Sequence, residues 1–155
     1  MDYSARIVLS ITDVSIYTVI IMVVFLAVSS FFSMSETVFS SVNIIRLKTF
    51  IEEGRKGSKK AVWITDNFDL TLSTILVGNN LANIALATVS VSVFSQIFES
   101  SPQLVTWLNT FVMTTIILIF GEIVPKSFAK NNAEKLALLI SRLLYAIITF
   151  LKPIT

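Results

Sequence analysis

Residues 14–35 read VSIYTVIIMVVFLAVSSFFSMS and carry no charge between Asp13 and Glu36. A helix of roughly 20 apolar residues is long enough to cross the hydrocarbon core of a bilayer. The stretch is too long for the apolar core of a cleaved secretory signal, and the residues before it include two aspartates beside a single arginine. It therefore predicts a membrane-spanning helix that remains in the protein.

The composition of the whole chain agrees with a membrane protein. Of its 155 residues, 54% are hydrophobic and only 14% are charged, with a mean hydropathy of +0.81, whereas soluble domains carry about a quarter charged residues. The sequence contains no cysteine and no histidine, which excludes disulfides, thiolate metal sites and imidazole catalysis. The net charge of +2 is too small to indicate a nucleic-acid partner. We expect neither an enzyme nor a nucleic-acid-binding protein.

The distribution of charge predicts an all-α integral membrane fold. Three stretches are apolar enough to span the membrane, at about 14–36, 69–98 and 103–124. Two further helices, at about 44–64 and 131–151, are expected beside the membrane. The second of these either lies on the membrane surface or packs on the helix bundle, in preference to forming a fourth span. Residues 1–155 are thus expected to form a single transmembrane domain.

Lysines and arginines predict the orientation of this domain. The loop after the first span carries Arg46, Lys48, Arg55, Lys56, Lys59 and Lys60, and the segment after the third carries Lys126, Lys130, Lys135, Arg142 and Lys152. The connection between the second and third spans has none. Because positive loops stay in the cytoplasm, the N-terminus is expected outside and the C-terminus inside a multi-pass cell-membrane protein.

Polar side chains recur along one face of the first span. Ser29, Ser33 and Glu36 follow one another at helical spacing. Small residues also allow helices to pack closely, so each serine taken alone is equally well explained by packing. A carboxylate on the same face is costly in lipid and favours a functional role for the stripe.

The second span contains three amides within five residues, Asn79, Asn80 and Asn83, directly after Gly78. A single buried asparagine commonly joins helices through a hydrogen bond. Three of them on one side of a helix, where each amide needs partners, favour a ligand-binding site.

The third span ends in the sequence Gly121-Glu122-Ile-Val-Pro125-Lys126. Proline has no N–H, so Pro125 cannot bond to the carbonyl of Gly121 four residues earlier. The motif therefore predicts a free carbonyl oxygen beside the Glu122 carboxylate. The alternative is an ordinary helix end at the membrane interface.

Together the three spans offer hydroxyl, amide, carbonyl and carboxylate oxygens, without sulfur or imidazole. Such ligands suit Mg²⁺, Ca²⁺ or an alkali ion far better than Zn²⁺ or Cu²⁺. The predicted metal-binding residues are Ser29, Ser33, Glu36, Asn79, Asn80, Asn83, Gly121 and Glu122.

Three motifs in order, at residues 33–37, 78–83 and 121–126, make the chain resemble the transmembrane domain of the cyclin-M (CNNM)/CorC magnesium transporters. The resemblance implies a homodimer, with three membrane helices and cytoplasmic juxtamembrane helices in each protomer. It also implies Mg²⁺ export, with Na⁺ proposed as the driving ion. Members usually continue into a pair of cytoplasmic CBS modules that bind ATP, which are absent from these 155 residues.

The same resemblance implies an ion site formed by the first-span serines, by Asn80 helped by Asn79 or Asn83, and by Gly121 with Glu122. Which serine binds the ion stays open, and Glu36 is either a ligand or a partner of the other helices. The alternative function is a membrane anchor and dimerisation scaffold that regulates another transporter. Phe31, Phe32 and Phe39 are candidates for the dimer surface.

Overall fold

The computed structural model describes residues 16–98 and 101–151, and every regular element within these ranges is helical. The elements are α2 (Ile16–Ser41), α3 (Ile44–Glu52), α4 (Ser58–Asp66), α5 (Phe68–Ile97), α6 (Pro102–Ile116), the π-helix η1 (Ile117–Ile123) and α7 (Val124–Leu151). Three helical stretches are long and apolar enough to cross a membrane, namely α2, α5 and the continuous run Pro102–Leu151. This confirms the prediction of an all-helical protein with three apolar spans.

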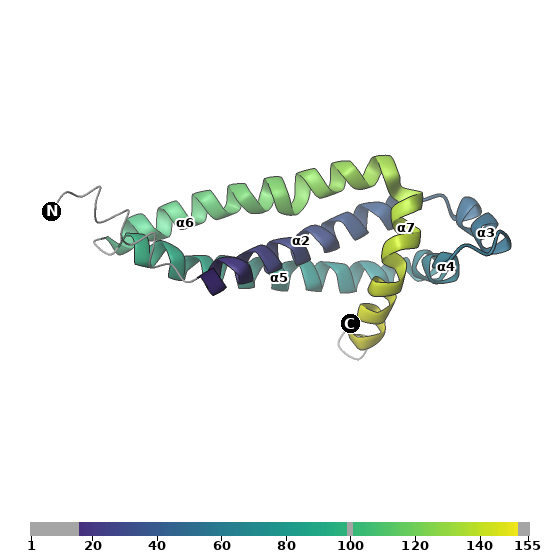
Figure 1. Ribbon diagram of the computed structural model, residues 1–155, viewed down its shortest axis with the longest axis horizontal. Coiled ribbons are helices and arrows are strands. Elements are labelled where there is room, and N and C mark those ends of the chain that lie inside the picture. Colours follow the sequence, from purple (N-terminus) through teal and green to yellow (C-terminus); the bar gives the residue numbers. More distant parts are fainter. Residues whose placement is uncertain (1–15, 99–100, 152–155) are drawn as a thin grey trace.

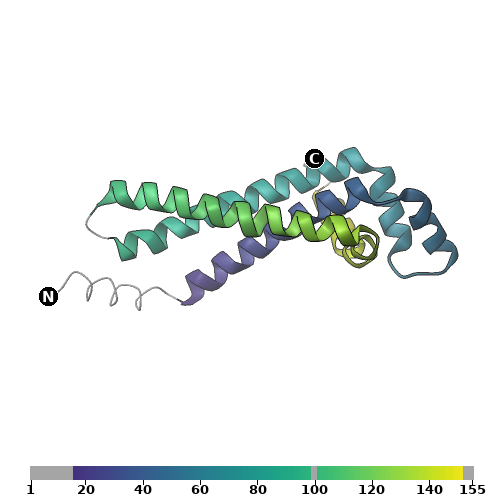
Figure 2. The same ribbon diagram turned by 90° about the horizontal axis from the view of Figure 1, so that it is seen from above.

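Helices α2, α5 and α6 with η1 run along the length of the molecule, and α2 is inclined to the other two (Figures 1 and 2). Helix α2 packs against α5 on one side and against η1 and α7 on another. The short helices α3 and α4 and the second half of α7 gather at one end, opposite the last turn of α5 and the first turn of α6 (Figure 1). As far as the structure describes them, both lysine- and arginine-rich segments of the sequence therefore lie at the same end of the bundle.

The predicted juxtamembrane region 44–64 contains the two helices α3 and α4. The side chain of Asn43 caps α3 by accepting hydrogen bonds from the N–H groups of Ile45 and Arg46. The turn between the two helices contains Gly54 and Gly57, with φ of 71° and 91°, a backbone conformation that glycine adopts without steric cost.

The helix predicted to begin near residue 131 begins earlier, because α7 continues directly from η1. A kink at Asn132 (φ −130°, ψ 22°) divides it, and the part beyond the kink turns across the end of the bundle (Figure 1). Buried residues along this part are Leu136, Ala137, Ile140, Ser141, Leu144 and Ile148. These residues pack this part of α7 on α2 and α4.

Most of the buried core lies toward the end that carries α3, α4 and α7. The first half of α2, by contrast, exposes large apolar side chains such as Ile16, Val23 and Val24, which suits a surface that faces lipid. Phe32 and Phe39 are buried inside this single chain, at 6% and 3% exposure. The prediction that these two residues form a dimer surface is therefore wrong.

Candidate ion-binding site

Ser29 lies where the three predicted spans meet. Its side chain is fully buried, and its hydroxyl donates a hydrogen bond of 2.9 Å to Oδ1 of Asn79 on α5. Gly121 on η1 packs directly against it, since a Cβ atom added to this glycine would lie 3.1 Å from Ser29 Oγ. Residues from α2, α5 and η1, distant in the sequence, thus converge on one hydroxyl group.

The π-helix η1 changes the backbone bonding around Gly121. The N–H of Val124 bonds to the carbonyl of Ile119, five residues earlier, where an α-helix would use Phe120. Pro125, the residue five beyond Phe120, has no N–H to offer. The Phe120 carbonyl therefore lacks both of the backbone donors that these two helix types would supply.

A second serine of α2 uses this carbonyl. The hydroxyl of Ser30 lies 2.7 Å from the oxygen of Phe120 and 2.8 Å from the oxygen of Leu26, so the two carbonyls share one hydrogen. Sequence reasoning predicted a free carbonyl at Gly121 but missed Phe120 and Ser30, because proline alone does not reveal a π-helix. Single π-helical turns are frequent at functional sites.

Two further oxygens beside Ser29 and Asn79 are buried without a hydrogen-bond partner among the described residues. They are Oγ of Ser33, one turn along α2, and Oδ1 of Asn83, one turn along α5. A buried polar atom without a partner is costly, so such atoms are commonly satisfied by water or an ion. Both are oxygens of the kind that hard cations bind.

The remaining predicted residues differ in their surroundings. Glu122 follows Gly121 directly and is half-buried, whereas Asn80 is exposed on α5. Asn79, not Asn80, therefore contacts Ser29. Within residues 16–98 and 101–151, no three acidic, histidine or cysteine side chains form a cluster that could hold a metal by themselves. Any ion here would depend on neutral oxygens and single carboxylates.

Glu36 forms an ion pair with Lys126, with Oε2 and Nζ separated by 3.1 Å. Their side chains are 33% and 40% exposed, and solvent screening at such exposure makes the pair worth less than about 1 kcal/mol. We expect Glu36→Gln to lower the free energy of unfolding by no more than this amount. Chemical denaturation in detergent, compared with Lys126→Gln and the double variant, measures the coupling. A coupling of several kcal/mol would contradict the assignment of a screened surface pair.

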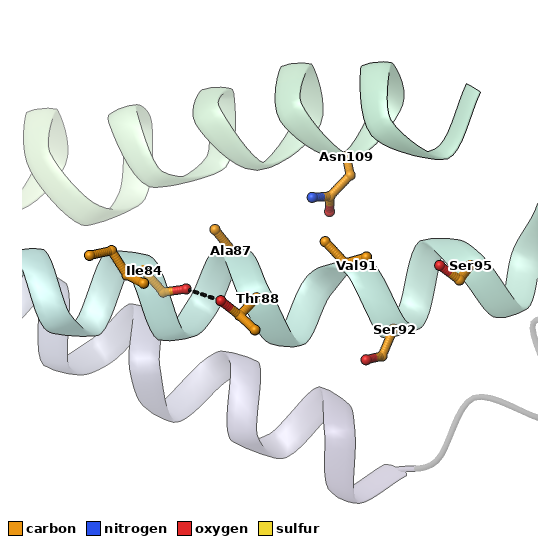
Figure 3. Close-up of a pocket in the computed structure, with 7 residues that line it drawn as sticks. All are labelled: Ile84, Ala87, Thr88, Val91, Ser92, Ser95 and Asn109. Atoms are coloured by element: carbon orange, nitrogen blue, oxygen red, sulfur yellow. Dashed lines mark hydrogen bonds between the residues drawn. The ribbon is translucent and has the colours of Figure 1, made fainter. Parts of the chain in front are cut away.

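A second polar feature lies away from Ser29, between α5 and α6. Asn109 is 7% exposed, and its Oδ1 has no hydrogen-bond partner among the described residues. It points toward α5 across a groove of about 660 Å³ (Figure 3). The groove is otherwise lined by Ile84, Ala87, Thr88, Val91, Ser92 and Ser95. Sequence reasoning did not single out Asn109, although one asparagine within an apolar span is a detectable signal.

The amino-acid sequence of this chain is similar to those of known proteins. A family model described as the cyclin M transmembrane N-terminal domain matches residues 20–155. A UPF0053 protein of Haemophilus influenzae is 36% identical over 136 residues, covering 87% of this chain and 31% of that protein. The UPF0053 inner membrane protein YfjD of Escherichia coli is 30% identical over 110 residues, covering 71% of this chain and 25% of that protein.

The similarity extends to plants. A chloroplastic DUF21 domain-containing protein of Arabidopsis thaliana is 33% identical over 125 residues, covering 79% of this chain but 18% of that protein. The chain thus spans a third or less of the length of these curated relatives. The family model covers most of the chain, including the three helices that are apolar enough to span a bilayer. The chain therefore belongs to the family of cyclin-M transmembrane domains and is a multi-pass membrane protein.

Proposed function

We propose that the chain is the membrane domain of a Mg²⁺ transporter and binds the ion between α2, α5 and η1. The observation that carries this proposal is the convergence of Ser29, Asn79 and Gly121, one from each of the three predicted spans. Mg²⁺ prefers oxygen ligands and gives up its water reluctantly. Several neutral oxygens supply ligands of this kind, and a nearby carboxylate helps to offset the cost of removing water from the ion.

In this proposal the unpartnered oxygens of Ser33 and Asn83 turn toward the ion or its water shell. Ser29 and Asn79 supply further oxygens, and Glu122 supplies the negative charge that offsets the cost of a divalent ion in the membrane. Asn80 is exposed, so of the predicted set it has the weakest support. Glu36 acts through Lys126 at the edge of the site.

The proposed orientation has the N-terminus outside and the C-terminus in the cytoplasm. It is supported by the positive-inside rule and by the gathering of α3, α4 and α7 at one end (Figure 1). Transport then requires a rearrangement of the three helices that opens the site outward. We propose that this movement exports Mg²⁺ and that a Na⁺ gradient drives it, as has been proposed for the family that the sequence resembles.

We also propose that the chain works as a homodimer. The groove beside Asn109 combines small side chains with a buried amide that lacks a partner, and such surfaces favour close helix packing in membranes. Because the matched region covers 31% or less of each of the three relatives described above, we propose that the complete protein carries the ATP-binding CBS modules outside this domain.

The first test compares two buried serines of α2 that lie two residues apart. Ser33 has no hydrogen-bond partner among the described residues, whereas Ser35 donates to the carbonyl of Phe31 at 2.7 Å. Calorimetry is expected to show Mg²⁺ affinity falling about tenfold in Ser33→Ala, because a bond to a charged group is worth roughly 1.5–3 kcal/mol, and staying unchanged in Ser35→Ala. Equal affinities in the two variants would remove Ser33 from the site.

The competing function is a membrane anchor and dimerisation scaffold. It is favoured by the hydrogen bonds of Ser29 and Ser30, which already join α2 to its neighbours. Flux of Mg²⁺ from proteoliposomes containing the purified protein, followed with a Mg²⁺-sensitive dye, separates the two. A transporter moves the ion and responds to a Na⁺ gradient, whereas a scaffold moves none.

A further inference from the structure

A basic site lies at the end of the bundle that carries α3, α4 and α7, outside the ion-binding region. Two adjoining pockets, of about 480 and 320 Å³, open there. Both are lined by Lys56 and Arg142, so they form one continuous basic surface, here called the basic cleft. Its other charged lining residues are Arg55, Lys59, Lys60 and Lys135.

The positive charge of the basic cleft is largely uncompensated. Arg55 is paired with Glu53 at 2.6 Å, but the other five cations form no ion pair within the part of the chain that the structure describes. Lys60 instead stands over the ring of Tyr145, 4.9 Å from its centre. Neither pocket is lined by an aspartate or glutamate. Such a surface attracts an anion.

The backbone holds the two sides of the basic cleft together. The hydroxyl of Ser141, which is fully buried on α7, donates a hydrogen bond of 3.0 Å to the carbonyl of Gly57. A Cβ atom at Gly57 would lie 2.3 Å from the carbonyl oxygen of Leu138, so the turn touches α7 directly. Lys56 and Arg142 are therefore neighbours through fixed contacts between the turn and α7.

Apolar side chains border the same site. Leu139 and Leu143 flank Arg142 on α7 and are 74% and 57% exposed, and Phe150 further along is 80% exposed. This part of α7 runs across the end of the three long helices (Figure 1), and in the proposed orientation this end lies at the cytoplasmic surface of the membrane. A helix with exposed leucines and cations in that position has the character of an interfacial helix.

We propose that the basic cleft binds the phosphate of an anionic phospholipid, with the acyl chains lying along Leu139 and Leu143. Basic pockets between membrane helices suit anionic headgroups, and long cationic side chains reach from apolar surface to the phosphate level. A soluble phosphate would use the cations but not the apolar border. The proposal requires only that the chain is embedded in a bilayer, so it does not depend on Mg²⁺ transport.

The test measures binding of phosphatidylglycerol to the purified protein in neutral detergent by native mass spectrometry. The variant Lys56→Gln/Arg142→Gln removes two exposed cations from the basic cleft, while Lys48→Gln/Lys130→Gln removes two exposed cations outside it. We expect affinity for phosphatidylglycerol to fall about tenfold or more in the first and by less than about twofold in the second. Phosphatidylcholine and glycerol phosphate are expected to bind at least tenfold more weakly than phosphatidylglycerol.

Equal losses in the two variants would mean that only net charge matters and would overturn the site. Equal binding of phosphatidylcholine would overturn the anionic preference, and equal binding of glycerol phosphate would overturn the lipid as its source. Unchanged thermal unfolding of the lipid-free variants establishes that they fold. If the first variant does not fold, Lys59→Gln/Lys60→Gln tests the same cleft and must show the same loss.

Discussion

Glu122→Gln is expected to lower Mg²⁺ affinity more than about 100-fold and to reduce transport to the level of empty liposomes. Glu122 is half-buried directly after Gly121, which packs against Ser29. In the proposed site it is the carboxylate nearest the ion. Two unit charges about 4 Å apart interact by about 4 kcal/mol at the effective dielectric of a protein surface, and the cation here is divalent. A 100-fold loss corresponds to about 2.7 kcal/mol and is therefore a conservative expectation.

Calorimetry in detergent and dye-monitored flux in proteoliposomes measure the two parts of this prediction. Glu52→Gln is the matched control, since Glu52 is exposed on α3 and lies in none of the ion-site contacts. A folded Glu122→Gln protein that keeps its affinity but loses transport would place Glu122 in the conformational change instead of the site. Unchanged Mg²⁺ affinity and transport would contradict any role of Glu122 in the ion site.

The fold could be predicted largely from charge. The apolar stretches between charged residues correspond to α2, α5 and the run beginning at Pro102, because a chain in lipid has few ways to satisfy its backbone other than a long helix. The bend at Asn132 was harder to predict. Asn131 and Asn132 indicate a helix start, but the helix runs through them with one non-helical residue, a choice set by packing of the following segment on the bundle.

The site could be predicted as three motifs but not as a set of contacts. Helical spacing places Asn79, Asn80 and Asn83 on one side of α5 without saying which of them meets Ser29. That depends on the rotation of α5 against α2, which the close packing of Gly78 on Phe32 helps to set. The π-helix was likewise beyond prediction, since Pro125 removes one donor but does not specify which carbonyl gains a new partner.

The close packing of Gly78 on Phe32 predicts the second large effect, a loss of stability and of Mg²⁺ affinity in Gly78→Ala. The added Cβ atom would lie 2.3 Å from Cζ of Phe32 and 2.6 and 2.7 Å from its two Cε atoms. The ring has little room to move, because it is 6% exposed and in edge-to-face contact with Phe31 at 5.5 Å. Helices α2 and α5 must then separate, and overpacking of this kind costs roughly 1–3 kcal/mol.

The same separation acts on the ion site, because Asn79 is the next residue and its bond to Ser29 spans only 2.9 Å. Denaturant unfolding in detergent is expected to show the lost stability, and calorimetry a parallel loss of Mg²⁺ affinity. Shortening the ring in Gly78→Ala/Phe32→Leu relieves the contact and is expected to recover most of both. If Gly78→Ala matches the parent in stability, or if the double variant is worse than either single change, the two helices are not held in register by this contact. The selection of Asn79 over Asn80 would then need another cause.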